Sequence, residues 1–264
     1  MPLIDAHGVR LYCRWEGRED APRLLLLHPV GADHSLWYEV VPLLTHRFQV
    51  LRPDLRGHGG SDAPSGDYRL DELASDVLSL CDRVGWDRFA VCGVSLGGMT
   101  AARIASLAPS RVTALAVCSA SPRMGQPPGG WDTFAQLALS QGMGPIADGM
   151  RDRMFGEAFR AAAPAIVQRA HRVTTWMAPQ GYAGAVAVLR DADLTPLLPS
   201  LHLPALVMRG RQDALVPIAA AEAWTNGLPQ ATLHSFECGH FPPLEDPAAF
   251  ADVLQQFVAP ALGA

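Results

Sequence analysis

The chain has 264 residues, of which 49% are hydrophobic and 18% charged, so it holds enough apolar material for a sizeable core and global disorder is excluded. Its 21 basic and 26 acidic residues give a net charge of −5, which argues against nucleic-acid binding through a basic surface. With no apolar run of about 18 residues and no secretory signal, we expect neither a membrane protein nor an exported one. Five scattered cysteines without a CxxC pair predict reduced thiols in a cytoplasmic protein.

The first 120 residues alternate between short β-rich runs and longer helical patterns. The run of four leucines at 24–27 lacks polar alternation, which is typical of a strand buried on both faces. This alternation predicts an α/β fold, with a mostly parallel twisted sheet and helices on both faces. The expected strands cover residues 11–15, 24–27, 48–51, 89–92 and 112–117, and the expected helices cover residues 70–84 and 96–107.

The pattern changes near residue 120, where six prolines and glycines within residues 121–130 predict a linker. Little β character follows until residue 205. The expected helices there cover residues 131–140, 144–154, 158–175 and 180–191, before strands at 205–208 and 232–236 and a closing helix at 247–258. The sequence thus predicts one α/β core, residues 1–120 and 199–264, interrupted by a helical cap at 121–198.

The motif that points to chemistry is Gly93-Val94-Ser95-Leu96-Gly97, between a predicted strand and a predicted helix. A serine on such a sharp turn leaves no room for side chains two residues before and after it, which explains the two glycines. The turn raises the hydroxyl above the sheet, and the positive end of the following helix favours negative charge there. Ser95 is therefore the predicted nucleophile.

A serine nucleophile needs a base, and in this type of fold the expected chain order is serine, acid, histidine. Three histidines follow residue 200. His202 comes before a strand and His234 falls inside one, whereas His240 lies in the loop between the last strand and the last helix. That loop is at the carboxyl edge of the sheet, on the same side as Ser95, so His240 is the predicted base.

The acid that orients the base is predicted to be Asp213, which directly follows the strand at 205–208 and so lies at the same edge. Asp191 and Asp193 in the insertion and Glu237 beside the base are the alternatives, and they are more easily explained as solvated or packing charges. The combination of Ser95, His240 and Asp213 is the catalytic triad that acyl transfer uses.

Acyl transfer also requires hydrogen-bond donors for the tetrahedral oxyanion. One is expected to be the backbone N–H of Leu96, directly after the nucleophile. The other is expected in the loop after residues 24–27, which reads His28-Pro29-Val30-Gly31. Because Pro29 has no N–H, Val30 is the predicted second donor, and His28 is expected to shape the loop.

Nearly the whole chain resembles the α/β-hydrolase superfamily. Besides Gly93–Gly98, the turn Asp54-Leu55-Arg56-Gly57-His58-Gly59-Gly60-Ser61 is similar to the D-x-R-G-x-G-x-S turn of that superfamily, and Gly239-His240-Phe241 is similar to its C-terminal end. Related branches fit less well. Dehalogenases and epoxide hydrolases use an aspartate where this chain has Ser95, and carbon–carbon hydrolases usually carry a tryptophan where it has Phe241.

Within the superfamily, the chain most resembles the 3-oxoadipate enol-lactonases of the β-ketoadipate pathway. The likeness extends into the insertion, at Pro122-Arg123-Met124, Trp131-Asp132 and Leu189-Arg190-Asp191-Ala192-Asp193-Leu194. It implies hydrolysis of an enol-lactone in aromatic catabolism. The chain departs from the family at Pro29-Val30, where Ser-Leu is common, and at Phe241-Pro242-Pro243, after the base.

The resemblance also implies a substrate pocket under the cap, with Trp131 as a contact. A dicarboxylic substrate needs a cation for its distal carboxylate, and Arg123 and Arg190 are the candidates. No metal or organic cofactor is expected, since no ligand spacing such as HExxH is present. Two alternatives stay open: a carboxylesterase or lactonase of another pathway, and a ligand receptor on a hydrolase scaffold. The expected partner is a small ester or lactone, and the sequence does not indicate the oligomeric state.

Overall fold

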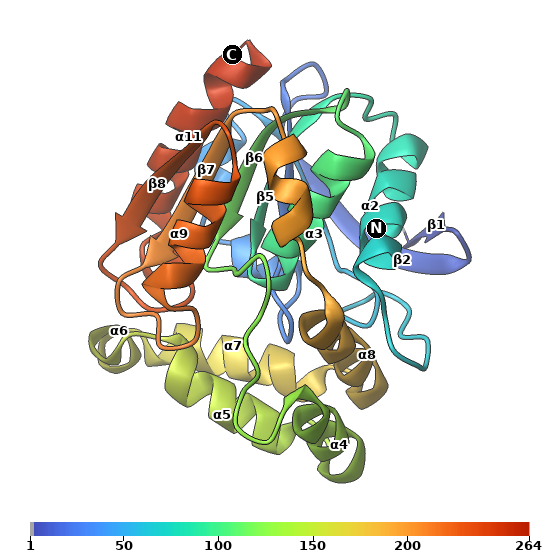
Figure 1. Cartoon of the computed structure of the whole chain (residues 1–264), viewed down its shortest axis with the longest axis vertical. Coiled ribbons are helices and arrows are strands. Elements are labelled where there is room, and N and C mark those ends of the chain that lie inside the picture. The colour runs from blue at the N-terminus through green and yellow to red at the C-terminus, as the bar shows by residue number, and fades with distance from the viewer. Residues whose placement is uncertain (1–2, 264) are drawn as a thin grey trace.

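The computed structural model describes residues 3–263 and is built on one sheet of eight strands in the order β1-β2-β4-β3-β5-β6-β7-β8 (Figure 1). The strands are β1 (Leu3–Ala6), β2 (Val9–Glu16), β3 (Arg23–Leu27), β4 (Gln49–Pro53), β5 (Phe89–Val94), β6 (Val112–Cys118), β7 (Ala205–Gly210) and β8 (Ala231–Phe236). The first two pairings, β1 with β2 and β2 with β4, are antiparallel, and all others are parallel. The sheet is therefore mostly parallel, as predicted.

Helices cover both faces of this sheet. They are α1 (Val41–Leu44), α2 (Leu70–Arg83), α3 (Leu96–Leu107), α9 (Ile218–Gly227), α10 (Pro242–Glu245) and α11 (Pro247–Leu262), with 3-10 turns at His34–Trp37 and Thr195–Ser200. In Figure 1, α3 and α9 lie in front of the sheet and α11 lies behind it. Both α3 and α11 contact the central strands β5 and β6, which explains why β5 is buried along its whole length. Apolar runs without alternation are what such two-sided burial requires.

Five further helices lie between β6 and β7 in the chain: α4 (Trp131–Gln141), α5 (Gly144–Met154), α6 (Glu157–Ala162), α7 (Pro164–Trp176) and α8 (Pro179–Asp191). Because β6 and β7 are direct neighbours in the sheet, this segment leaves the core and returns to it. The five helices, here called the inserted helices, lie together at one end of the molecule, below the strand ends (Figure 1).

The structure differs from the sequence prediction in one helix that is divided and in several elements that were not predicted. The helix expected at 158–175 is two helices, α6 and α7, because Pro164 lacks the N–H that a continuous helix needs and instead occupies the first turn of α7. The short strand β1, the helices α1, α9 and α10 and the two 3-10 turns were not predicted. No helix among residues 3–263 has the length and apolar character to cross a membrane.

Candidate active site

Ser95 is the single residue between β5 and α3, and its backbone is strained. Its φ of 53° lies in the left-handed region, which is unfavourable for residues other than glycine. A Cβ on Gly93 would overlap the carbonyl of Gly97, and a Cβ on Gly97 would overlap the carbonyl of Leu27. The flanking glycines are therefore required by close approach of the backbone, for the reason that the sequence pattern indicated.

His240 and Asp213 come together at the carboxyl ends of the last two strands. The imidazole Nδ1 lies 2.7 Å from Oδ2 of Asp213, and both side chains are almost completely buried. The other carboxylate oxygen accepts the backbone N–H groups of Leu215 and Val216, at 2.9 and 3.0 Å. Burial opposes ionisation of Asp213, but the charge and hydrogen bond of His240 and these two N–H groups outweigh it, and the pKa of Asp213 lies below its usual value.

Ser95 and His240 open into the same cavity of about 540 Å³. Among residues 3–263 the Ser95 hydroxyl has no hydrogen-bonding partner, so it faces this cavity and not a protein acceptor. Nucleophile and base are often slightly apart without a substrate and tighten when one binds. The arrangement can therefore move a proton from the serine to the imidazole while Asp213 orients the ring.

The loop after β3 is shaped by His28. The N–H of Leu55 donates to Nε2 of His28 at 2.9 Å, so the ring proton is on Nδ1, which donates to the carbonyl of Pro29 at 2.8 Å. In a trans peptide the carbonyl and the N–H point to opposite sides, so this bond sets the direction of the Val30 N–H. Within the described chain, neither the Val30 nor the Leu96 N–H donates to a protein acceptor. Both are thus available to an oxyanion.

The fold and the motif agree with the comparison against protein families, in which residues 22–247 match the family described as the alpha/beta hydrolase fold. The chain is an α/β-hydrolase. This confirms the predicted fold class and the prediction that the protein is an enzyme of the hydrolase type. The match spans the core on both sides of the inserted helices.

This hydrolase is similar to known enol-lactonases over most of its length. It is 31% identical over 247 residues to 3-oxoadipate enol-lactonase 2 of Acinetobacter baylyi, which covers 94% of this chain and 92% of that enzyme. The solved enol-lactonase of Burkholderia xenovorans has a TM-score of 0.94 and 31% identity, covering 97% of this chain and 99% of the other. A malate-bound thermophilic esterase of Thermogutta terrifontis has a TM-score of 0.91 and 27% identity, covering 98% and 96%. The resemblance drawn from the sequence motifs is confirmed.

Two of the three substrate contacts expected from the sequence line the large cavity of the hydrolase. Trp131 lies at the start of α4, and its ring nitrogen donates to the carbonyl of Gly125 at 3.1 Å. Arg123 lines the cavity from the segment before α4, and its largely exposed guanidinium lies 3.6 Å from the carboxylate of Asp193. Both residues are thus placed at the cavity wall, Arg123 with an anionic partner already present.

Arg190 is placed elsewhere. Its guanidinium bonds the carboxylates of Asp67, Asp132 and Asp191 at 2.7 Å each, and it is not among the residues that line the cavity. The structure therefore has Arg190 joining α8 to α4 and to the loop before α2, and does not bring it together with Ser95. Sequence reasoning missed Arg153, which does line the cavity. Spacing along the helix could have identified Arg153 from the sequence, because it follows Met150 by three residues and so lies on the same face of α5, which points to the cavity.

The loop that carries His240 is bonded directly to the inserted helices. The backbone N–H of His240 donates to the carbonyl of Met154, at the end of α5, with a distance of 2.7 Å. Beside it, one carboxylate oxygen of Glu245 accepts the N–H of Gly156 and the N–H of Gly239, both at 3.0 Å. The turn between α5 and α6 and the loop that carries His240 are thus hydrogen-bonded to each other and to the same carboxylate oxygen of Glu245.

A cluster of side chains with the spacing of metal ligands lies near the loop after β3, and its oxygens already have protein partners. It consists of Asp33, His34 and Asp54. Asp54 accepts the N–H groups of His34 and Gly60 at 2.7 and 2.8 Å, and Asp33 accepts the N–H of Ser35 at 2.8 Å. These acceptors close turns of the backbone, which accounts for the cluster without an ion.

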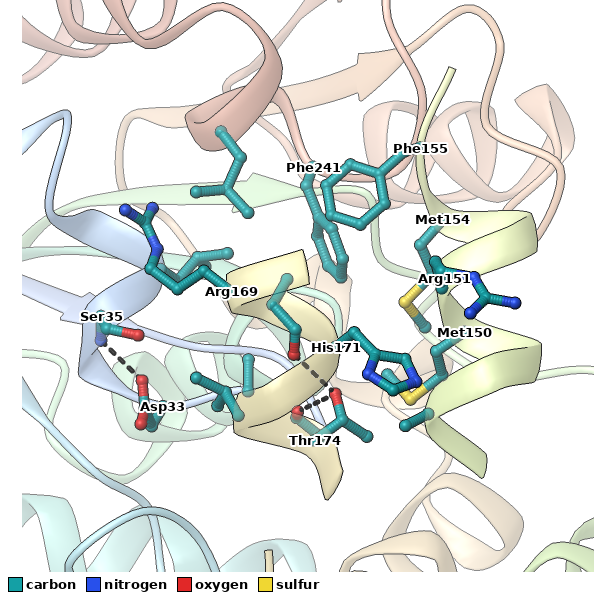
Figure 2. A pocket seen from close by; sticks show the side chains of 17 residues that line it. Asp33, Ser35, Met150, Arg151, Met154, Phe155, Arg169, His171, Thr174 and Phe241 are labelled. Atoms are coloured by element: carbon teal, nitrogen blue, oxygen red, sulfur yellow. Dashed lines mark hydrogen bonds between the residues drawn. The ribbon is translucent and has the colours of Figure 1, made fainter. Parts of the chain in front are cut away.

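A second cavity, of about 30 Å³, separates α5 and α7 from the loop after β3 (Figure 2). Met150 and Met154 of α5 line both this cavity and the large one, so they form a wall between the two. Next to it, the hydroxyl of Thr174 donates to the carbonyl of Gly31 at 2.7 Å, and also lies 3.2 Å from the carbonyl of Ala170 in its own helix. Thr174 therefore ties α7 to the loop whose Val30 N–H is the expected oxyanion donor.

Replacing Thr174 by valine, which has the same shape, is expected to lower the free energy of unfolding by about 1–2 kcal/mol, because the buried carbonyl of Gly31 loses its partner. We also expect kcat to fall about tenfold with little change in KM, since the loop of Val30 loosens. Thr174→Ser should restore both. The control is Thr175→Val, whose hydroxyl bonds only its own helix, at His171. Equal kcat for Thr174→Val and Thr175→Val in steady-state assays would contradict this role.

Proposed function

We propose that this hydrolase cleaves carboxylic ester bonds with Ser95 as nucleophile, and that its substrate is 3-oxoadipate enol-lactone. The observation that carries the proposal is the meeting of Ser95 and the Asp213-bonded His240 at one cavity, beside two backbone N–H groups without protein partners. The similarity to enol-lactonases along nearly the whole chain favours the lactone. The reaction would then belong to aromatic catabolism.

The first half of the reaction forms an acyl-enzyme. Ser95 attacks the lactone carbonyl as its proton passes to Nε2 of His240, and Asp213 stabilises the imidazolium from the other side of the ring. The N–H groups of Val30 and Leu96 receive the negative charge of the carbonyl oxygen. Collapse of the tetrahedral intermediate breaks the ring ester bond, and the released enolate takes the proton from His240 and tautomerises to the ketone.

The second half releases the acid. A water molecule gives a proton to His240 and attacks the acyl carbon, and the same N–H groups again stabilise the oxyanion. When the bond to Ser95 breaks, its oxygen recovers the proton from His240. The chain's own side chains and backbone account for every proton and electron pair in this scheme.

The inserted helices would act as a cap in this reaction. Apolar side chains that they contribute, among them Phe134, Met150 and Leu189, line the cavity opposite Ser95. An apolar roof excludes bulk water and strengthens the hydrogen bonds to the developing charge. We propose residues 121–198 as this cap and the two flanking segments as the catalytic core.

The substrate proposal is tested by kcat/KM of the purified protein on 3-oxoadipate enol-lactone, p-nitrophenyl acetate and p-nitrophenyl butyrate, with Ser95→Ala as the blank. We expect about 10⁴ M⁻¹s⁻¹ or more on the lactone and weak turnover of the aryl esters. Good aryl-ester turnover without lactone activity would retain the serine mechanism and discard the lactone. Lactone turnover by Ser95→Ala equal to that of the native enzyme would discard the mechanism.

A second candidate function is a carboxylesterase of another pathway. It is favoured by the departures from the enol-lactonase pattern at Pro29-Val30 and Phe241-Pro243, of which Val30 lines the large cavity and Phe241 the second one, and by the similarity to a thermophilic esterase. Lactone and ester hydrolysis share their chemistry, so the same side chains serve both. The substrate comparison above separates these two candidates.

A further inference from the structure

Arg153 is a cation without an anionic partner at the wall of the large cavity. Its Nε donates to the carbonyl of Gly149, one turn earlier in α5, at 3.0 Å. Among residues 3–263, no carboxylate lies within 4.0 Å of its guanidinium, and its two terminal nitrogens donate to no protein acceptor. The other two arginines considered for this role differ: Arg123 is paired with Asp193, and Arg190 is paired with three aspartates.

Tyr182 adds a second polar group to the same cavity. The residue is 5% exposed and lines the cavity from α8, yet its hydroxyl bonds no protein group in the described chain. The hydroxyl oxygen itself is not fully buried, so it reaches the cavity and can donate to a ligand there. Burial raises the pKa of this hydroxyl, and the positive charge of Arg153 lowers it in part. A guanidinium from α5 and a hydroxyl from α8 thus line the same cavity as Ser95.

We propose that Arg153 and Tyr182 form a subsite for a carboxylate on the substrate, remote from the ester bond that Ser95 attacks. The two terminal nitrogens of a guanidinium match a carboxylate in a bidentate pair, and the hydroxyl can donate a third hydrogen bond. This inference rests on the proposed function, because it assigns a class of substrate to the same cavity.

The surroundings of Arg153 define that class more closely. Met150 and Met154 lie one turn before and directly after it on α5, and both line the cavity. These two side chains are apolar, and α5 contributes no second cation to the wall of this cavity. The substrate class that fits is a monoanionic ester or lactone in which a short aliphatic chain separates the carboxylate from the reacting carbonyl.

The test uses two esters that differ at one end: mono-p-nitrophenyl glutarate, which ends in a carboxylate, and p-nitrophenyl valerate, which ends in a methyl group at the same place. For the native enzyme we expect the higher kcat/KM on the glutarate ester. In Arg153→Met, kcat/KM on the glutarate ester should fall about 10- to 100-fold, mainly through KM, as for loss of hydrogen bonds to a charged group. The valerate ester should change less than about twofold, the range of surface substitutions.

The matched control is Arg151→Met, which removes the same charge from the same helix but outside the large cavity, where Arg151 is paired with Asp148 and Asp152. It should leave both esters within about twofold. Tyr182→Phe should lower the glutarate value several-fold, and Arg153→Lys should retain part of it. Equal losses on both esters in Arg153→Met, or no loss on either, would overturn the subsite.

Failure of the proposed function would look different. If Ser95→Ala hydrolysed the esters as fast as the native protein, the serine mechanism would be lost, whatever Arg153 does. The subsite can then be tested by measuring the affinity of the Ser95→Ala protein for glutarate by calorimetry. We expect this binding to weaken at least tenfold when Arg153→Met is added and to weaken in high salt. Unchanged glutarate binding in the double variant would overturn the subsite independently of turnover.

Discussion

Replacing Ser95 by alanine is expected to lower kcat by about 10⁶-fold, as removal of the nucleophile does in other triad hydrolases. The Ser95 hydroxyl stands on the turn between β5 and α3, at the cavity that His240 also lines, so it is the nucleophile that the proposed mechanism needs. Alanine keeps the Cβ and the left-handed backbone at this position, so thermal unfolding should change little. The measurement is kcat on whichever ester or lactone the native enzyme hydrolyses best.

A chemical control separates loss of the nucleophile from damage to the fold. An aryl or alkyl fluorophosphonate should form a covalent adduct with the native protein, located on the peptide that contains Ser95 by mass spectrometry. The Ser95→Ala protein should remain unlabelled under the same conditions. Labelling of the variant at the native rate would show that another residue is the reactive nucleophile.

The second large effect is expected for Asp213→Asn, with kcat about 10⁴-fold lower near neutral pH, the size of the same change in a serine protease. In the native protein, one oxygen of Asp213 accepts from Leu215 and Val216 and the other faces Nδ1 of His240. An asparagine that keeps its oxygen on the two backbone N–H groups must point its amide NH₂ at the ring. Nδ1 then has to accept, the proton moves to Nε2, and the ring can no longer take the proton of the serine.

The control for this variant is Glu237→Gln, which removes the other carboxylate of the loop before the base. Glu237 is exposed and bonds the guanidinium of Arg211 at 2.7 Å, so its loss should change kcat less than about twofold. Steady-state kinetics of the two variants on one substrate decide the identity of the acid. If Glu237→Gln were as damaging as Asp213→Asn, the acid would have to be reassigned.

Much of the fold could be predicted because the signals are local. The buried strands are uninterrupted apolar runs, and Gly93 is fixed by its contact with Gly97, four residues away, although Gly97 is itself required by the carbonyl of Leu27 on the neighbouring strand. The placement of Asp213 and His240 followed from a rule of parallel sheets, that the carboxyl ends of the strands share one edge. Elements that were missed have weak patterns: β1, α1 and α10 have only four residues each, and only one residue of β1 is buried.

The substrate contacts could not be predicted in the same way, because the role of an arginine depends on which carboxylates the fold brings near it. Arg190 and Arg153 are both arginines near the end of a helix of the insertion. Three aspartates from separate parts of the chain surround the first, and no carboxylate within 4.0 Å in the described chain faces the second. Asp67 is 123 residues from Arg190 in sequence. At that separation a local sequence pattern cannot indicate that the two side chains meet.

The bonds between the inserted helices and the loop of His240 limit how the enzyme can admit and release its ligands. Moving the α5–α6 turn away from the core would remove the acceptor of the His240 N–H and break the hydrogen bond from Gly156 to Glu245. Opening there would release the loop of the proposed base in every cycle. We therefore expect passage beside the segment before α4, which lines the cavity at Gly125–Pro127 and continues into two consecutive glycines with positive φ, Gly129 and Gly130. Ligands can then exchange while the hydrogen bonds that hold the loop of His240 stay intact from one turnover to the next.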